Sequence, residues 1–420
     1  MPQAFNNIWY VRLPQTQAPE PAWMSVSTLL NMETCPRRWS LSSSEYPEIW
    51  ERSGYPPKPY SATLAGQITH SSLESITKAL DRAGCSSIHS SLFVSVLREL
   101  GGFTRVIETK IDQLLKVLST NPRAQHNLAH LGTKLHSRVP ELRTRLQMLI
   151  SKLQIQSRNV GAYRSQETST SRSPLTVGMH AEVELRAERL GWRGFVDFMN
   201  LGETECEIID FKTGDAKPEH EFQTRVYSLL WARDVELNPH ARLVDRLVLS
   251  YFESEIEVTP LKTSEMDDFE KDLMTRSENA LSLVRQEPPP AYPSVLNCRF
   301  CPVRQICDEY WTTTTQKQLK AERLAEAGVH PNITLIDIEV ELVERQSLTN
   351  WSAIVTTSAE LPPGTTVYVQ FSQANMSLLN MLEVGKQSRL IEASLIPQVE
   401  DRASSEFLIV MNTMSEAFIA

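Results

Sequence analysis

The sequence predicts a mixed α/β core with a helical insertion, followed by a small all-β barrel. Three patterns predict this fold class. Leucines recur at three- and four-residue steps through a long stretch that includes Leu128, Leu131 and Leu135, as in helices that pack on a core. The pattern changes to strand-like alternation between residues 177 and 212, and short strand-like runs return after residue 331.

The N-terminal region is predicted to begin with a loose leader, because residues 1–22 carry Pro and Gln without periodicity. Ser25 or Ser27 then caps a helix that reaches Trp39. This places Cys35 on or beside the helix.

A second helix near residues 62–80 carries His70. Helical periodicity continues over residues 90–158, and we expect a helical insertion at about residues 88–165. The polar stretch at residues 165–174 is predicted to be a linker.

The core itself is predicted from three consecutive strands, a helix and a further strand, at residues 177–189, 192–200, 205–212, 218–236 and 243–252. Helices at residues 264–285 and 316–327 flank a Pro-rich stretch and a cysteine cluster. Five short strands suit a small OB-like barrel, at residues 333–343, 352–356, 366–371, 388–395 and 407–411. We therefore expect one domain over residues 23–315 and a barrel domain over residues 331–420.

The composition is that of an ordinary globular protein, with 41% hydrophobic and 22% charged residues. A net charge of -9 argues against a surface that coats nucleic acid as a whole. No apolar run reaches the ~20 residues that a membrane span requires, so we expect a soluble, cytoplasmic protein without a membrane partner.

The charge is unevenly spread along the chain. Residues 98–172 contain 13 Lys and Arg against 5 Asp and Glu, whereas residues 331–420 contain 4 against 11. If any part lies along phosphates, it is the first stretch. The plainer alternative is that this stretch is the solvated face of helices.

The strongest chemical signal is Asp210-Phe211-Lys212 at the end of a predicted strand, with Asp197 on the strand before it. Neighbouring strands of this kind place both carboxylates at one end of the sheet, where they can share a hard divalent cation. Such a cation lowers the pKa of an attacking water, and an ammonium group stabilises the developing charge. An isolated Asp-x-Lys is a weak signal, so its neighbours decide its weight.

Several polar residues accompany this triplet. Gln223 and Tyr227 are four residues apart on the following helix and share one face. His70 offers an imidazole on its own helix, although a lone helical histidine is more often structural. Either Glu182 or Glu184 on the first strand is a candidate supporting acid, and an exposed strand face explains both equally well.

Four of the six cysteines form a second constellation. Cys298, Cys301 and Cys307 are clustered as C-x2-C-x5-C, and Cys35 lies far upstream. Four sulfur ligands suit either zinc or an iron-sulfur cluster, and the spacing leaves both open. The remaining two, Cys85 and Cys206, have no partners in the pattern and are predicted to be plain buried residues.

The order Gly-x-x-x-His, Gly-x-x-Asp, Asp-x-Lys and Gln-x-x-x-Tyr resembles that of the RecB-like PD-(D/E)XK nucleases. With the cysteines it resembles most closely the iron-sulfur subgroup, which includes the CRISPR-associated adaptation exonucleases and the AddB nuclease domain. The resemblance implies a restriction-endonuclease-like mixed sheet, a [4Fe-4S] cluster on Cys35, Cys298, Cys301 and Cys307, and Mg²⁺ or Mn²⁺ at the active site. It also implies individual roles: His70, Asp197, Asp210 and the carbonyl of Phe211 as ligands, Lys212 as the catalytic lysine, and Gln223 and Tyr227 as DNA contacts or braces.

By this resemblance the chain is expected to be a metal-dependent deoxyribonuclease that acts on single strands or DNA ends, in DNA repair, recombination or phage defence. The alternative is a catalytically silent DNA-binding or assembly subunit of a larger complex. The acidic barrel is expected to dock a protein partner such as a helicase, because its charge opposes phosphate contacts.

Overall fold

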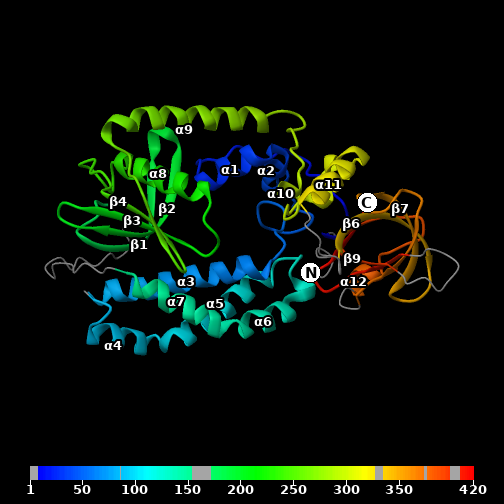
Figure 1. Cartoon of the computed structure of the whole chain (residues 1–420), viewed down its shortest axis with the longest axis horizontal. Coiled ribbons are helices and arrows are strands. Elements are labelled where there is room, and N and C mark those ends of the chain that lie inside the picture. The colour runs from blue at the N-terminus through cyan, green and yellow to red at the C-terminus, as the bar shows by residue number, and fades with distance from the viewer. Residues whose placement is uncertain (1–7, 86, 154–171, 327–333, 373–375, 398–406) are drawn as a thin grey trace.

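The structure is a computed structural model, and it describes residues 8–85, 87–153, 172–326, 334–372, 376–397 and 407–420. Figure 1 shows a β-sheet with its helices at one end and a barrel at the other, with the short helix α10 (Val295–Cys298) between them. The predicted mixed α/β core and the predicted OB-like barrel are both confirmed. Within the described ranges, none of the helices is long and apolar enough to cross a membrane.

The core sheet has five strands in sequence order. They are β1 (Gly178–Ala187), β2 (Trp192–Leu201), β3 (Cys206–Lys212), β4 (Arg246–Tyr251) and β5 (Glu255–Val258). The first three form an antiparallel meander, and β4 lies parallel to β3. A parallel pair needs a crossover, which α8 (Pro218–Arg233) supplies.

Helices cover both faces of this sheet. Side chains alternate across a strand, so the neighbours Ile208 and Ile209 belong to opposite cores. Ile208 packs in the core that contains α8, and Ile209 packs in the core that contains α3 (Ser61–Arg82). Two further helices belong to the α8 side, α1 (Val26–Thr34) and α9 (Thr263–Val284).

The helical insertion consists of α4 (Ser91–Glu99), α5 (Gly102–Leu118), α6 (Leu128–Ser137) and α7 (Val139–Ser151). Its apolar stripe packs against α3, as the periodicity predicts. Residues 154–171, and with them most of the predicted linker, lie outside the described residues.

Several cations of the basic stretch at residues 98–172 have partners within the chain. Arg138 and Arg145 pair with Glu141, Arg172 pairs with Asp234, and Lys152 donates to the carbonyl oxygen of Tyr251. These contacts favour the plainer interpretation, in which this stretch is the charged face of packed helices.

The C-terminal barrel contains β6 (Thr334–Arg345), β7 (Asn350–Ser358), β8 (Thr366–Gln370), β9 (Gln387–Pro397), β10 (Phe407–Val410) and β11 (Glu416–Ile419). The first five close into a ring in the order β6-β7-β8-β10-β9, which is the OB order. Between β8 and β9 lies the short helix α12 (Met376–Leu379). The unpredicted strand β11 pairs with β9 beside the ring.

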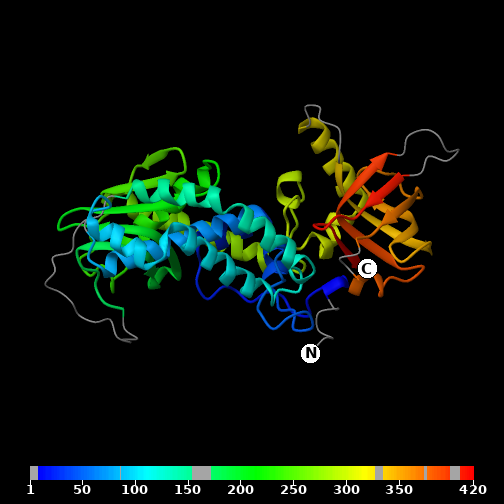
Figure 2. The same ribbon diagram turned by 90° about the horizontal axis from the view of Figure 1, so that it is seen from below.

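The N-terminal segment differs from the predicted loose leader where the structure describes it. Ile8 and Trp9 are buried with the barrel core, and Tyr10 forms a β-bridge with Ile419. Figure 2 shows the N-terminal segment, in blue, beside the barrel. These apolar side chains complete one side of the barrel. A run of three residues, 8–10, is too short to show a helix or strand period, so the sequence pattern does not reveal it. Residues 1–7 lie outside the described part.

The helix predicted to run to Trp39 is two helices that meet at Cys35. Ser25 caps α1 by accepting a hydrogen bond of 3.2 Å from the backbone N–H of Thr28. Cys35 has an extended backbone, and Pro36 opens α2 (Pro36–Ser43). Proline lacks the N–H that would continue α1 and has the φ angle that suits a first helical position.

Candidate active site

The middle of β2 and the end of β3 bring two carboxylates together beside α3. Asp197 and Asp210 flank the paired residues Phe198 and Ile209, so they lie opposite each other on adjacent strands. Asp197 Oδ2 accepts a hydrogen bond of 2.7 Å from the backbone N–H of Phe211. The Nδ1 atom of His70 lies 3.7 Å from the same oxygen.

Burial sets the electrostatics of these groups. It raises the pKa of Asp197 well above its ordinary value, and the nearby Asp210 raises it further. Burial also raises the pKa of Asp210, against the opposing effect of Lys212. The pKa of His70 is lowered, mainly by burial. Two desolvated carboxylates that repel each other, next to a neutral imidazole, form a site that a cation would stabilise.

Lys212 belongs to a continuous line of polar contacts. Its Nζ atom lies 2.5 Å from Asp210 Oδ2 and donates to Gln223 Oε1 at 2.6 Å. Gln223 Nε2 in turn donates to the hydroxyl oxygen of Tyr227 at 2.6 Å. Burial raises the pKa of Tyr227, so its phenol stays neutral. The two residues on α8 therefore hold the ammonium group against Asp210.

Two glycines allow neighbouring elements to pack closely at the site. A Cβ atom on Gly194 would lie 2.7 Å from Cε1 of Tyr227, which is closer than carbon atoms pack. A Cβ atom on Gly66 would lie 2.9 Å from Oγ1 of Thr213, directly after Lys212. These positions explain in structural terms why glycine precedes Asp197 by three residues and His70 by four.

A family model of the PD-(D/E)XK nuclease superfamily matches residues 23–308, more than half of the chain. The chain belongs to this nuclease superfamily. No curated protein matches it.

Two solved structures show limited likeness to this chain. The crystal structure of SSO0001 has 18% identity and a TM-score of 0.20, covering 32% of this chain and 62% of that chain, so the chain spans less than two thirds of that protein. A murine DNA-binding protein bound with double-stranded DNA has 9% identity and a TM-score of 0.15, covering 58% of this chain and 94% of that chain. Such low TM-scores carry no argument about function.

The candidate site opens into a pocket of about 380 Å³. All six predicted active-site side chains and Phe211 line it, together with residues that the sequence analysis did not name as candidates, including His220 and Lys217. His220 Nδ1 lies 2.8 Å from the hydroxyl oxygen of Tyr251. Its position three residues before Gln223, on the same face of α8, is the signal that would have found it.

Glu182 is the acid of β1 that belongs near the site. Its backbone has a φ of 53°, a left-handed value that is rare for a residue with a side chain. Its charge helps to raise the pKa of Asp197. Glu184, which the sequence weighs equally, pairs with Arg186 instead. Alternation along a strand does not distinguish the two.

The four predicted cysteine ligands line a second pocket, between α2 and α10. The backbone N–H of Tyr292 lies 3.5 Å from Cys35 Sγ in a hydrogen bond. Burial raises the pKa of Cys298, Cys301 and Cys307 to about 11, so as free thiols they are protonated at neutral pH. The other two cysteines, Cys85 and Cys206, are buried, as predicted.

Across the described ranges, no three His, Cys, Asp or Glu side chains lie close enough to hold one metal ion. At the carboxylate site, the ligand oxygens face protein donors, Phe211 N–H for Asp197 and the ammonium of Lys212 for Asp210. At the cysteine pocket, the thiols surround a shared space without converging on one point.

Proposed function

We propose that this nuclease hydrolyses phosphodiester bonds of DNA, on single strands or ends, with Mg²⁺ or Mn²⁺ bound by His70, Asp197, Asp210 and the carbonyl of Phe211. The supporting observation is the line of contacts from Asp210 through Lys212 and Gln223 to Tyr227 within one polar pocket. Carboxylate and carbonyl oxygens are the ligands that hard divalent cations prefer.

The bound cation would lower the pKa of an attacking water and offset charge on the phosphate. Lys212 supplies a positive group that stabilises the developing oxyanion, and Gln223 keeps its Nζ atom in place. His70 stays neutral at neutral pH, because burial lowers its pKa, and so offers a lone pair as a ligand.

The test is cleavage of end-labelled single- and double-stranded DNA by the full chain in Mg²⁺, Mn²⁺ or EDTA. We expect metal-dependent cleavage that Asp210→Asn and Lys212→Met each reduce by about 10³ or more. Asp268→Asn, which changes an exposed carboxylate on α9, serves as the matched control and should cleave like the wild type.

A DNA-binding experiment in Ca²⁺ distinguishes the proposed nuclease from the alternative, a catalytically silent subunit. A wild-type chain that binds DNA in Ca²⁺ but cleaves in neither Mg²⁺ nor Mn²⁺ is a catalytically silent DNA-binding or assembly subunit. Cleavage at the wild-type rate by Asp210→Asn would contradict the assigned site.

We further propose that Cys35, Cys298, Cys301 and Cys307 hold a [4Fe-4S] cluster, which would place the chain in the RecB-like iron-sulfur subgroup. Thiolates around one zinc ion lie about 3.8 Å apart, because tetrahedral Zn–S bonds are about 2.3 Å long. A cluster separates the thiolates with iron and sulfide atoms. The four cysteines line one pocket, which suits either group, and the resemblance of their one-plus-three arrangement to the iron-sulfur subgroup favours the cluster.

Anaerobic purification tests this proposal. We expect a brown protein with about four irons per chain and broad absorption near ~400 nm. A colourless protein with one zinc per chain would instead support the zinc alternative.

The docking of a helicase-like partner on the barrel is also a proposal. Its support is that Val343 and Val384 are exposed on the barrel, with the exposed acids Glu341, Glu344 and Glu383 near them in the sequence. The backbone N–H of Gly385 donates to the carbonyl oxygen of Leu342, which brings the two segments together. The domain limits, at residues 23–315 and 331–420, and a role in DNA repair or phage defence likewise stay predictions.

A further inference from the structure

Three arginines connect the barrel to the segment that carries three of the cysteines. We call residues 298–307 the cysteine loop. We propose that Arg123, Arg304 and Arg389 are positioning residues, held by acids of the barrel, that fix the shape of the cysteine loop around its metal centre. This inference rests on the proposed metal centre and extends it to the C-terminal barrel.

Each guanidinium donates through Nη1 to a different carbonyl oxygen of the cysteine loop. The contacts are Arg304 to Arg299 O at 3.0 Å, Arg123 to Pro302 O at 2.6 Å and Arg389 to Gln305 O at 2.7 Å. The three carbonyls are evenly spaced along the loop: that of Arg299 lies between Cys298 and Cys301, and those of Pro302 and Gln305 lie between Cys301 and Cys307. Contacts at this spacing restrain the whole loop, because each cysteine lies within two residues of a carbonyl that an arginine holds.

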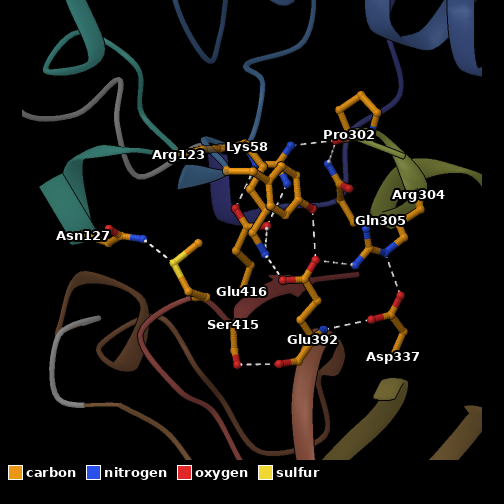
Figure 3. A network of polar contacts seen from close by, with 12 residues as sticks. Lys58, Arg123, Asn127, Pro302, Arg304, Gln305, Asp337, Glu392, Ser415 and Glu416 are labelled. Atoms are coloured by element: carbon orange, nitrogen blue, oxygen red, sulfur yellow. Dashed lines mark hydrogen bonds and ion pairs between the residues drawn. The ribbon is translucent and has the colours of Figure 1, made fainter. Parts of the chain in front are cut away.

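Acids of the barrel hold the other nitrogens of the same three guanidiniums. The pairs are Arg123 with Glu416 at 2.8 and 2.7 Å, Arg304 with Asp337 at 2.6 Å and Glu392 at 3.0 Å, and Arg389 with Glu339 at 2.8 Å (Figure 3 for the first two arginines). A guanidinium is planar and its donors form a rigid fork. In Arg123 and Arg304 the acids fix both Nε and Nη2, so the direction of Nη1 is fixed as well, and in Arg389 Glu339 fixes Nε.

The network around the first two arginines is balanced in charge and removed from water. Lys58 adds a third cation, 2.8 Å from Glu392 and 3.5 Å from Glu416. Arg123 and Glu416 are almost fully buried. A buried charge that loses its partner is strongly unfavourable, so the barrel acids and these two arginines depend on each other.

The backbone at Glu392 is strained in a way that serves this network. Its φ of 55° is left-handed, although it lies within strand β9. Its N–H donates to Asp337 Oδ1 at 2.8 Å, and Ser415 Oγ donates to its carbonyl oxygen at 2.7 Å. These contacts hold the residue in a conformation from which its carboxylate reaches both Lys58 and Arg304.

A barrel that only covered the core would need nothing more than apolar packing. That packing is present, because Ile306 and Trp311 share one core with the barrel strands. The directed contacts to loop carbonyls are additional to it. They assign the barrel a role in setting the cysteine positions.

Arg304→Lys and Arg389→Lys test the role of the fork, because lysine keeps the charge but replaces the three nitrogens of a rigid plane with a single nitrogen on a flexible chain, so the direction from the acid to the carbonyl is no longer fixed. Arg233→Lys is the matched control, since Arg233 pairs with Asp267 and Glu270 on α9 away from the loop. We measure how fast each purified full chain releases bound iron or zinc, using a chelator whose metal complex is coloured. We expect release at least ten times faster from the loop variants than from the control.

Equal release rates in the loop variants and the control would overturn the proposal. If the wild type holds no iron or zinc, the proposed metal centre fails, and alkylation of the three loop thiols by iodoacetamide then decides the positioning role. Faster alkylation in Arg304→Lys than in Arg233→Lys supports it, and equal rates overturn it. Loss of DNA cleavage alone counts for neither outcome.

Discussion

Lys212 is held by a line of side chains, each of which can be removed singly. Gln223→Leu removes the oxygen that accepts a hydrogen bond from Lys212 Nζ, so the ammonium group of Lys212 loses its fixed position. We expect kcat to fall about 10- to 100-fold with little change in KM, as for other supporting contacts in metal sites. Steady-state kinetics on a labelled single strand measure both constants.

Tyr227→Phe is a milder change in the same line of contacts. It removes the contact between Gln223 and the phenol but leaves the contact between Gln223 and Lys212. Its effect on kcat should therefore be smaller, and a larger effect than that of Gln223→Leu would mean that Tyr227 acts independently. Gln125→Leu, on the surface of the helical insertion, is the control for a lost glutamine.

The sequence predicts the composition of the candidate site well, because motif spacing fixes which residues share a strand end or a helix face. His70, Asp197, Asp210, Lys212, Gln223 and Tyr227 all line one pocket, although their roles stay predictions. The orientation of Glu182 could not be predicted from the sequence. It depends on a left-handed backbone that alternation does not encode.

At the scale of elements, long periodic segments were predictable and short or interrupted ones were not. The sequence predicts α3, α8 and α9 and the three strands of the meander to within a few residues. It misses β5 and β11, four residues each, whose acidic residues interrupt the apolar pattern. Pro36 divides a helix that the apolar pattern alone extends.

The close approach of β2 and α8 gives a prediction at this scale. In Gly194→Ala, the added methyl group overlaps the ring of Tyr227, which must move and take Gln223 with it. We expect the free energy of unfolding to fall by about 1–3 kcal/mol, as for other overpacked sites, and kcat to fall with it. Urea denaturation and cleavage kinetics measure the two effects.

Gly132→Ala in α6 is the control for this variant. There the added methyl group meets only a Leu115 methyl at 3.3 Å, and alanine favours a helix. Wild-type stability and activity in Gly194→Ala would contradict the close packing between β2 and α8.

For the whole molecule, the docking of the barrel was beyond sequence reasoning. Arg123 and Glu416 are 293 residues apart, and no local pattern links them. The acidic charge of the barrel predicts a surface for another protein. Part of that charge instead meets cations of this chain, because Asp337 and Glu416 are buried against Arg304 and Arg123.

This docking makes stability depend on pH. Burial alone would raise the pKa of Glu416, but Arg123 and Lys58 overcome it and lower the pKa from 4.5 to about 2. The stabilisation is therefore complete above pH 4.5 and is lost as the pH falls towards 2. At pH 7 we expect Glu416→Gln to unfold with a free energy lower by on the order of 3 kcal/mol.

Denaturation of the wild type and of Glu416→Gln between about pH 7 and pH 3 measures this difference. The gap between the two proteins should narrow below pH 4.5, because the wild-type carboxylate becomes protonated. A gap that is the same at every pH would show that the charge of Glu416 does not stabilise the docked barrel. Glu219→Gln, at an exposed site on α8, should show no gap.

The pairing of Tyr10 with Ile419 also determines when the chain can finish folding. The backbone N–H of Val11 donates to the carbonyl oxygen of Ile419 at 2.8 Å, so this contact joins residues about 400 positions apart. At about 5–20 residues per second, a ribosome needs about 20–80 s to make the chain between them. Ile8 and Trp9 are synthesised about 400 residues before Ile419 and cannot be fully buried until Ile419 is made, which leaves them open to chaperones during that time.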